Sequence, residues 1–467
     1  MMIYGENVLE IVENFDVERV RLGAIRLLEK VGVKVLREDV AQRLLAKGFI
    51  KKGGRLLFHK KIVEDFLVPK PIKYQPKYPV KKVLGGSAFS YLDPEDGKMK
   101  PMDREHAVQY TKLADSYYEE KVLGRCPGEP NDAAPGIRQL ESYYISCRYS
   151  RNAGGVFAAF NVPLALAYKE MVAVMGGKYC PGVNIMSPLV VGGPNFDVCL
   201  HFLDNGLADH IGGDSIPAFG VACPMDWYAA ASQTVAEGVA NILIFKALGA
   251  KGGSWYAHFY PADMRTGLVV LSTPESIIRI LMEAKLNEYL GNPRWYANVM
   301  YCPSKVPDSQ AATEKAICAS LVIANGFDAV GSVGSLCGDE VWSPQQFILD
   351  MEMFSFLESS LLRKSVEPVS AENIVALVEE GTKSGDVFMG TETTSERFRD
   401  YCWLSKIYNR GPRGAWIKNP VDIRAAAWAE AKQRIATHDY ELDKDKVKAL
   451  EKIVASAKAG KFGKVTE

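Results

Sequence analysis

The sequence has no excess of charge of either sign. Its 467 residues include 56 lysines and arginines and 56 aspartates and glutamates, so the formal net charge is zero. A balanced chain lacks the long-range field that attracts polyphosphate, and nucleic acid is therefore not expected as a main partner. A net charge near zero also does little to oppose self-association, and we expect a homo-oligomer.

Long apolar runs are missing as well. No window holds about eighteen uninterrupted apolar residues, the length that a helix needs to cross a bilayer. The first twenty residues (MMIYGENVLEIVENFDVERV) lack the basic segment followed by an apolar segment that defines a secretory signal. The nine cysteines are odd in number and form no dense framework, which predicts reduced thiols. We expect no membrane span, and a cytoplasmic protein.

Motifs for common cofactors are scarce. Several glycine pairs occur, such as 212–213 and 252–253, but none opens a GxGxxG or Walker-type loop between a strand and a helix. Three cysteines, Cys223, Cys302 and Cys337, lie near the ends of predicted strands and could combine with a histidine to bind zinc. No CxxC, HxC or HExxH spacing supports such a site, and we expect no metal in this chain.

The first hundred residues differ in pattern from the rest. Residues 17–31 and 39–47 have the periodicity of amphipathic helices, the first of them ended by Gly32. Residues 70–82 (KPIKYQPKYPVKK) are rich in proline and lysine, which predicts an extended connector. Residues 89–99 (FSYLDPEDGKM) place two short apolar stretches around a turn, which predicts a β-hairpin.

From Asp103 onward, short strand-like runs alternate with helical windows. Thr273-Pro274 and Asp308 are typical helix starts, and Gly291 and Gly326 are typical helix ends. Parallel strands in sequence need helical crossovers, so the alternation predicts a parallel sheet covered by helices. Eight candidate strands can be counted, at residues 121–126, 155–160, 182–186, 215–221, 254–259, 295–301, 328–333 and 386–389.

The count of eight decides the predicted fold class, because a doubly wound open sheet would show a similar rhythm. We predict an α/β protein built on a (β/α)8 TIM barrel over residues 102–407. An N-terminal extension of helices, connector and hairpin over residues 1–101 packs on it, and residues 408–467 form a C-terminal helical extension.

In such a barrel the active site lies where the strands end. Predicted strands five and six end in aromatic residues, among them Trp255, His258, Tyr260 and Tyr301. Aromatic faces hold quaternary ammonium groups, which have no N–H to donate. For any one ring the alternative is packing in the core, but the group of four favours a binding site. Four further candidates are Asn184 and Glu392 at other strand ends, and Phe89 and Tyr91 on the hairpin.

Several stretches together resemble one family. The most specific is residues 304–314 (SKVPDSQAATE), which precede Gly-Phe-Asp at 326–328; the others are 24–33 (AIRLLEKVGV), 184–189 (NIMSPL), 220–243 (GVACPMDWYAAASQTVAEGVANIL), 262–267 (ADMRTG), 274–275 (PE) and 407–416 (IYNRGPRGAW). Over nearly its whole length the chain is similar to the trimethylamine:corrinoid methyltransferase superfamily. It most resembles the branch that lacks pyrrolysine, typified by glycine betaine methyltransferases.

The resemblance implies a barrel that presents a methylated amine to the Co(I) of a corrinoid (cobalamin) carried by a separate, cognate corrinoid protein. In trimethylamine enzymes of the superfamily a pyrrolysine precedes the helix that begins near residue 308. Residues 301–305 (YCPSK) are ordinary here, which favours a small substrate that is already a quaternary amine. Such a substrate leaves as a neutral amine without a general acid, so the protein mainly supplies alignment and desolvation.

A betaine would also need donors for its carboxylate. Arg125, Asn161, His258 and Tyr260 are candidates by their positions near strand ends. Glycine betaine, carnitine, proline betaine and a quaternary amine without a carboxylate all stay open as substrates. Two alternative functions remain as well: a zinc-dependent methyltransferase on a similar barrel, and a non-catalytic betaine-binding protein.

Overall fold

The computed structural model describes residues 7–256, 258–292, 296–362, 368–383, 385 and 387–463. Its first part is mainly helical, with α1 (Val8–Glu13), α2 (Val17–Lys30), β1 (Lys34–Val35), α3 (Glu38–Leu45), β2 (Ile50–Lys52), β3 (Arg55–Leu57) and α4 (Lys60–Phe66). The apolar face of α2 packs on α9 (Trp227–Ala247), where a side chain at Gly23 would collide with Ser232. The two helices predicted near the N-terminus are therefore confirmed.

Parallel strands form two arcs at the centre of the protein. One arc has the order β11 (Tyr296–Ala297), β12 (Ala329–Gly331), β4 (Lys81–Val83) and β7 (Val122–Leu123). The other pairs β8 (Gly182–Asn184) with β10 (Gly212–Asp214), and parallel bridges to Gly252 and Trp255 extend it by one segment. Among the described residues no backbone pairing joins the two arcs, so the structure is a mixed α/β fold without a continuous closed sheet.

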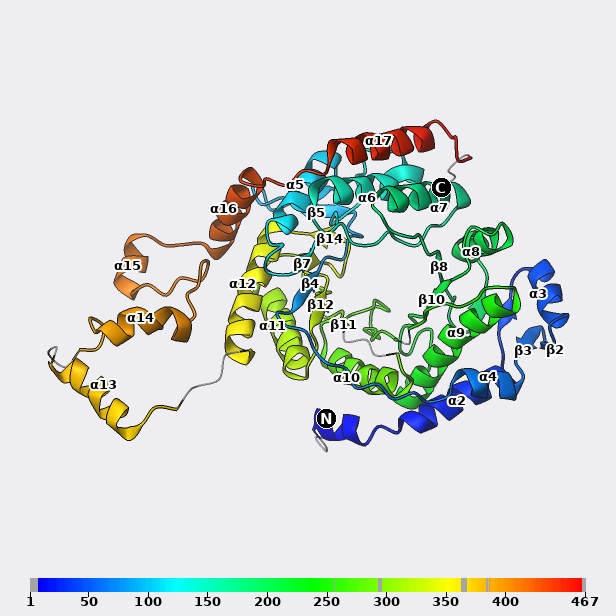
Figure 1. The fold of residues 1–467 in the computed structure, drawn as a ribbon, viewed down its shortest axis with the longest axis horizontal. Helices are drawn as coiled ribbons and strands as arrows, with labels where there is room; N and C mark the ends of the chain where they lie inside the picture. The colour runs from blue at the N-terminus through cyan, green and yellow to red at the C-terminus, as the bar shows by residue number, and fades with distance from the viewer. Residues whose placement is uncertain are drawn as a thin grey trace.

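Eight helices surround the two arcs (Figure 1). The first seven lie on crossovers between successive strand segments, α6 and α7 on the same one, and the eighth follows the last strand. They are α5 (Arg104–Asp115), α6 (Arg138–Tyr149), α7 (Val162–Val174), α8 (Pro194–Asp204), α9, α10 (Pro274–Tyr289), α11 (Ser309–Ala324) and α12 (Pro344–Leu361). The predicted helix starts are correct. Thr273 precedes α10, and the Asp308 carboxylate accepts a hydrogen bond from the amide of Ala311 at 2.9 Å.

Three of the eight predicted strands are wrong. Residues 155–160 form no strand, and neither do residues 387–389, which lie far from the sheet. The predicted strand at 215–221 is displaced to β10, whose sequence Gly-Gly-Asp has low strand propensity and depends on its parallel neighbours. Of the described residues in 254–259, which leave out residue 257, Trp255 alone makes a bridge, and residue 295, where the predicted sixth strand begins, is not described either.

The strand missing from the prediction is β4, at the end of the segment interpreted as a connector. It lies between β12 and β7 in the first arc. Its central residue, Lys82, is buried, and its ammonium donates to the Glu358 carboxylate on α12 at 2.6 Å. A lysine-rich run predicts an exposed connector, but here one of its lysines is buried and forms an ion pair. The boundaries of the three predicted units, at 101/102 and 407/408, stay predictions.

The predicted hairpin is confirmed as β5 (Ser90–Leu92) paired antiparallel with β6 (Met99–Pro101). It belongs to a second, four-stranded sheet completed by β13 (Ser335–Leu336) and β14 (Val341–Trp342). Tyr91 stacks on His106 of α5, with ring centroids 4.2 Å apart. The sheet thus covers one end of the first arc.

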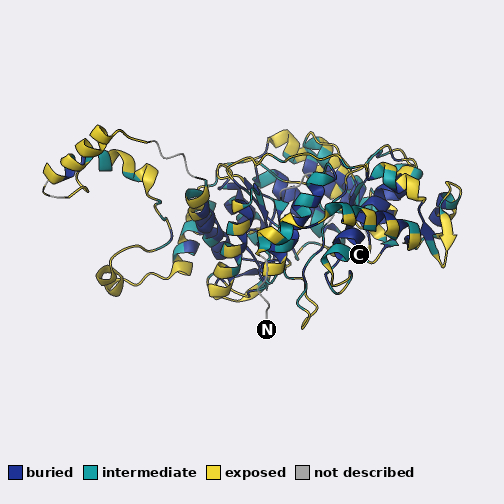
Figure 2. Cartoon of the chain, turned by 90° about the horizontal axis from the view of Figure 1, so that it is seen from below, coloured by how far each residue is buried: buried dark blue, intermediate teal, exposed yellow. Residues whose placement is uncertain are grey.

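The C-terminal part contains an arm of helices that project from the body, followed by two helices that pack on it. Beyond α12, the helices α13 (Ala371–Lys383), α14 (Glu392–Tyr401) and α15 (Arg413–Lys418) project from the body (Figure 2). The chain returns through α16 (Ile423–Ala436) and α17 (Lys444–Lys458), which pack on α12 and α7. No helix among the described residues is long and apolar enough to cross a membrane.

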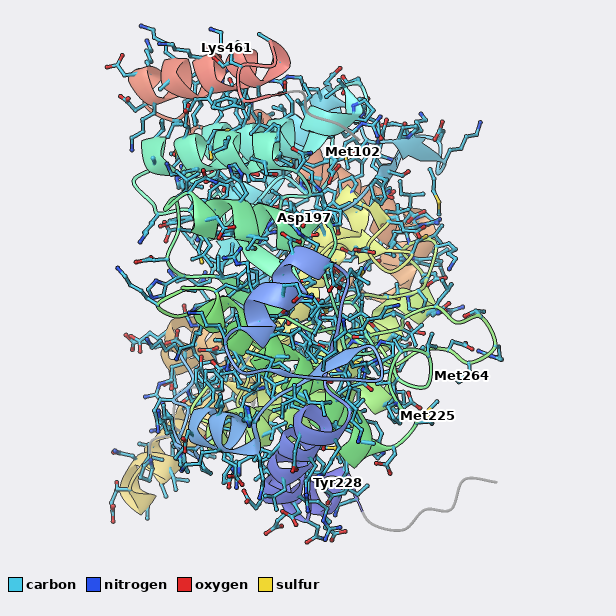
Figure 3. All side chains as sticks on the ribbon, turned by 90° about the vertical axis from the view of Figure 1, so that its right-hand side faces the viewer. Met102, Asp197, Met225, Tyr228, Met264 and Lys461 are labelled. Atoms are coloured by element: carbon cyan, nitrogen blue, oxygen red, sulfur yellow. The ribbon has the colours of Figure 1, made fainter. Side chains whose placement is uncertain are left out.

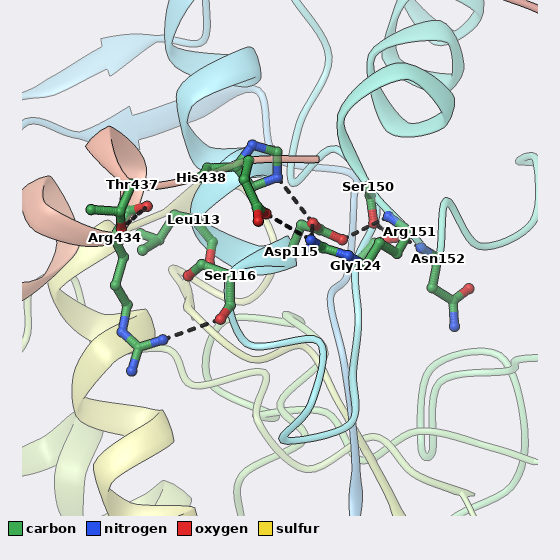
Figure 4. A network of polar contacts seen from close by, with 11 residues as sticks. Leu113, Asp115, Ser116, Gly124, Ser150, Arg151, Asn152, Arg434, Thr437 and His438 are labelled. Carbon is green, nitrogen blue, oxygen red and sulfur yellow. Dashed lines mark hydrogen bonds and ion pairs between the residues drawn. The ribbon is translucent and has the colours of Figure 1, made fainter. Parts of the chain in front are cut away.

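A buried charge network fixes the end of α16 (Figure 4). The Asp115 carboxylate, 1% exposed, accepts hydrogen bonds from the Arg151 guanidinium at 2.6 Å and contacts Nε2 of His438 at 2.9 Å. The backbone amide of Arg151 donates to the same carboxylate at 2.6 Å. Three segments far apart in the sequence are therefore held by one carboxylate.

Candidate active site at the strand ends

Polar and aromatic side chains meet where the strands of the two arcs end. Asp214 ends β10, and its carboxylate lies 3.3 Å from Nε2 of His258. The His258 ring stacks on the ring of Tyr260, with centroids 5.5 Å apart. Burial raises the pKa of Tyr260 to about 12, so its hydroxyl is protonated at neutral pH. Two of the predicted site residues are therefore brought together.

The first arc contributes the other half of this group. The Tyr301 hydroxyl donates to the Asp339 carboxylate at 3.3 Å, and the same carboxylate oxygen accepts from Ser87 at 2.8 Å. Burial, with Asp339 and Tyr260 nearby, raises the pKa of Tyr301 above its ordinary value. Tyr301 thus belongs to the same group as Tyr260.

The ends of two more strands add further residues to this group. Ser332, directly after β12, donates to the amide oxygen of Asn298, directly after β11, at 2.9 Å. The hydroxyl of Tyr296 lies against Gly331 of β12, where any side chain would collide with it. We call the whole group the strand-end cluster: Arg125, Asp214, His258, Tyr260, Tyr296, Asn298, Tyr301, Ser332 and Asp339.

Arg125 follows β7 and is the cation of the cluster. Its guanidinium lies over the Phe157 ring at 4.9 Å, and Tyr296 and Tyr301 are close enough to favour its charged form. Among the described residues no carboxylate is within ion-pair distance of Arg125. Burial lowers its pKa, because a charge is costly away from water. Gly86 and Gly154 make room for the side chain, since a β-carbon on Gly86 would collide with it.

A second arginine lies behind the cluster. Arg279 of α10 is 2% exposed, and its Nη1 donates to Glu283 at 2.7 Å. Its Nε and Nη2 are buried without a hydrogen-bond partner among the described residues, next to a cavity of about 30 Å³ that His258 and Tyr260 also line. A cavity of this size holds about one water molecule and no trimethylammonium group.

A buried glutamate holds two of the strand-end loops. Glu237 of α9 is fully buried and accepts hydrogen bonds from the Ser187 hydroxyl at 2.7 Å and the Leu189 amide at 2.8 Å. The hydroxyl of Ser215, next to Asp214, donates to it as well. Glu237 therefore fixes the position of the chain just after β8 and just after β10.

Other predicted site residues lie elsewhere. Trp255 is 9% exposed and packs on α9, where a side chain at Gly238 would collide with its ring. Tyr91 is buried against α5, and Asn161 caps α7 by accepting from the Leu164 amide at 2.9 Å. Glu392 starts α14 on the arm, because the eighth predicted strand does not exist.

Two predicted residues lie near the cluster without joining it. Phe89 is 56% exposed at the rim, where its amide donates to the carbonyl of Glu340 at 3.0 Å, next to Asp339. Asn184 is exposed at the end of β8, and its backbone is in register with Asp214. The prediction missed Asp214, because Gly-Gly-Asp does not look like a strand, and it missed Asp339, because that residue comes from a loop with no strand signal.

Of the three cysteines that suggested zinc, Cys302 and Cys337 lie in one small apolar cluster, and Cys223 lies in another. Cys302 lies 3.2 Å from the Glu314 carboxylate, and Cys223 donates to the Ala218 carbonyl at 3.6 Å. Burial raises the pKa of both thiols to about 12, which favours the protonated form over the thiolate that binds zinc. In the described part of the chain no three histidine, cysteine or acidic side chains are grouped to hold a metal ion.

Comparison with known proteins identifies the family. The sequence matches the trimethylamine methyltransferase (MTTB) family over residues 3–461. It is 21% identical over 447 residues to a glycine betaine methyltransferase of Desulfitobacterium hafniense (strain Y51), covering 91% of each chain. It is 22% identical over 298 residues to the trimethylamine methyltransferase MttB of Methanosarcina barkeri (strain Fusaro / DSM 804), covering 63% of this chain and 54% of that one.

Among solved structures, the monomethylamine methyltransferase MtmB of Methanosarcina barkeri matches with a TM-score of 0.41 and 11% identity, over 92% of this chain and 95% of that one. That likeness is too distant to support an argument about the fold. The family match, in contrast, spans almost every residue and agrees with the resemblance found in the sequence motifs. The chain belongs to the trimethylamine methyltransferase family.

Proposed function

We propose that this protein moves one methyl group from a quaternary amine to the cobalt of a corrinoid held by a separate protein. Family membership supports the reaction class, and the name of the relative that aligns over 91% of its length supports a betaine as the type of substrate. We also propose that the two parallel arcs belong to one (β/α)8 barrel whose first strand is β4. The ring of eight helices around the arcs supports that arrangement.

The observation that carries the substrate type is Arg125. Arg125 is half-buried, and a cation in that position without an acid partner among the described residues is costly unless an anion completes it. A betaine supplies the anion in its carboxylate, and its ammonium group can lie against the faces of Tyr301 and Tyr260. A quaternary amine without a carboxylate would instead meet the unbalanced charge of Arg125, so the site should select zwitterions.

The chemistry asks little of the protein beyond positioning. The corrinoid supplies Co(I), the nucleophile to which the methyl group is transferred. The C–N bond breaks with its electron pair staying on nitrogen, so a neutral tertiary amine leaves and no general acid is needed. The transferred carbon loses positive charge on the way, so aromatic rings alone would favour the bound substrate. The cluster must therefore act chiefly by aligning the methyl group.

The rim above the cluster suits a docking protein. Met225 and Met264 come from two strand-end loops, project on the same side of the molecule and both reach Gly220 (Figure 3). They are 55% and 59% exposed, and Val221 between the loops is 60% exposed. Flexible methionine side chains are common on surfaces that bind a protein partner. We propose that the corrinoid protein covers this rim.

The experiment is a methyl-transfer assay with free cob(I)alamin, following methylcobalamin by absorbance. The substrates are glycine betaine, carnitine, proline betaine, tetramethylammonium and trimethylamine. We expect turnover of at least one betaine, and no turnover of trimethylamine. Activity confined to trimethylamine, or none with any substrate in the presence of the cognate corrinoid protein, would contradict the proposal.

The matched variant is Arg125→Met, which keeps an unbranched apolar stem and removes the charged guanidinium. A hydrogen bond to a charged group contributes about 1.5–3 kcal/mol, so kcat/KM for the betaine should fall about ten- to 150-fold. The same variant should leave tetramethylammonium turnover unchanged or raise it. An equal loss of kcat/KM with both substrates would show that Arg125 supports the fold and does not bind the substrate carboxylate.

A further inference from the structure

We infer that the arm, residues 368–421, is an exchange arm that packs on a second copy of this chain. The arm leaves the body after α12 and touches α12 again between α14 and α15, where Trp403 donates to Ser355 and Ser405 to Glu352. It rejoins the body at α16, which packs on α12. Figures 1 and 2 both show α13 and α15 standing away from the body. The inference concerns assembly and does not depend on the proposed function.

The arm has its own internal structure, so it is a preformed element. On α13 the Glu380 carboxylate accepts hydrogen bonds from the Glu392 amide at 2.8 Å and from the Thr393 hydroxyl at 2.9 Å, which ties the start of α14 to α13. Phe388 packs over Gly381, where any side chain would collide with its ring. The two helices are therefore fixed to each other while their outer faces stay open.

The open faces are apolar. On α13, Ile374, Val375 and Val378 are 51%, 56% and 51% exposed, with the spacing of one helix face. About a third of the strongly exposed large apolar side chains among the described residues lie in the arm: Val369, Ile374, Val375, Val378, Val387, Phe388, Met389, Tyr401, Leu404, Trp416, Ile417 and Val421. Surface of this kind in one place marks an interface.

The same chain offers a surface that fits such an arm. Beyond Gln310, the exposed residues of α11 carry no charge, and they are Ala312, Thr313, Ile317, Leu321 and Ala324. Ile317 and Leu321 are 55% and 40% exposed, one turn apart. Next to them lies a groove of about 460 Å³ between α11 and α12, whose lining includes the small and apolar residues Ala312, Ala316, Leu349 and Met353 and the charged residues Asp308, Lys315, Asp350 and Arg424. Small and apolar residues allow a helix to approach closely.

A second copy is the occupant that these observations favour. The groove ends at Tyr408 and Ile423, which are at the base of the arm, and the arm extends away from it on the far side of α12 (Figure 1). Two copies related by a twofold axis near α12 would each place an arm on the other's α11 face. The net charge of zero offers no long-range repulsion between copies. The rim at Met225 and Met264 is a separate surface and stays free for another protein.

Sedimentation velocity of the full chain tests the inference with two double variants. One is Ile374→Asp with Val378→Asp on the arm, and the other is Ile317→Lys with Leu321→Lys on α11. Wild-type protein should sediment as two or more chains of 51.5 kDa, and each variant alone should self-associate about a hundredfold more weakly. Far-UV circular dichroism checks that each variant is folded, since the changed side chains are exposed.

Mixing the two variants sharpens the test. In a mixed pair one arm meets an unaltered α11 face, and the other, acidic arm meets a lysine-bearing face, so association should return. The matched control is Leu22→Asp on α2, 46% exposed and outside both surfaces, which should assemble like wild type. A monomeric wild-type protein, variants that assemble normally, or no recovery on mixing would each overturn the inference.

Discussion

In the strand-end cluster, charged and polar side chains are partly buried, whereas in the arm large apolar side chains are exposed to water. Asp214 and Asp339 each have a partner in the cluster, and Arg125 alone lacks one. In the arm, the apolar residues Ile374 and Val378 are exposed to solvent. Both regions depart from ordinary burial, in opposite directions, and we propose that each is completed by something outside the chain. The missing group differs: an anion in one case, an apolar surface in the other.

The largest effect should come from breaking a buried charge that has its partners. Asp115→Asn removes the buried carboxylate that Arg151 and His438 share, and this takes the ionic partner away from the buried His438 ring, whereas Arg151 keeps Asp439. Removing one member of a buried ionic group costs about 3–5 kcal/mol, which urea denaturation would measure as a loss in the free energy of unfolding. The control is Asp439→Asn, which removes the exposed partner of Arg151 and should hardly change stability. Equal effects of both variants would contradict the importance of burial.

The next prediction compares an aromatic residue of the core, Trp255, with an aromatic residue of the strand-end cluster, Tyr301. Trp255→Ala empties a packed position beside α9 and should lower the free energy of unfolding by about 3–5 kcal/mol. Tyr301→Ala should lower kcat/KM for a betaine about five- to thirtyfold, which corresponds to the roughly 1–2 kcal/mol of one aromatic contact. The two measurements are thermal or urea unfolding and the cob(I)alamin assay. If Trp255→Phe lowers kcat/KM without lowering the free energy of unfolding, Trp255 contacts the substrate and is part of the site.

The smallest effect concerns pH. Burial raises the pKa of Tyr260 to about 12, against about 10 in an unfolded chain. Below pH 10 the hydroxyl is protonated in both states and contributes no pH dependence. Above pH 10 the unfolded state loses the proton first, so stability falls by up to about 1.4 kcal/mol per pH unit until pH 12. Tyr260→Phe should flatten this part of the curve, measured by urea midpoints at pH 9 to 11.5, and Tyr118→Phe, an exposed tyrosine, is the control.

Much of the helical framework follows from local signals. The Thr273-Pro274 and Asp308 starts, and the α2 and hairpin patterns, depend on residues only a few positions apart, so one stretch of sequence contains the whole signal. The aromatic residues at predicted strand ends gave three of the nine residues of the cluster: His258, Tyr260 and Tyr301. The family itself was recognisable from motifs such as residues 304–314.

The rest depended on contacts between distant segments. Strand β4, with its lysines, became a strand only because β12 and β7 bond to it on both sides, and β10 is extended only beside β8. The direction of a side chain is likewise a tertiary property. Trp255 and His258 are three positions apart, yet one packs on Gly238 of α9 and the other contacts Asp214.

The sequence by itself therefore determined the helices, their caps, the family and the aromatic character of the strand ends, because each of these is encoded in neighbouring residues. Only the tertiary structure decided which strands pair, which aromatic ring enters the core, that Arg125 has no acid partner, and that α13 to α15 leave the body. These depend on the free energy of burial and of charge pairing, and that free energy is set by residues hundreds of positions apart.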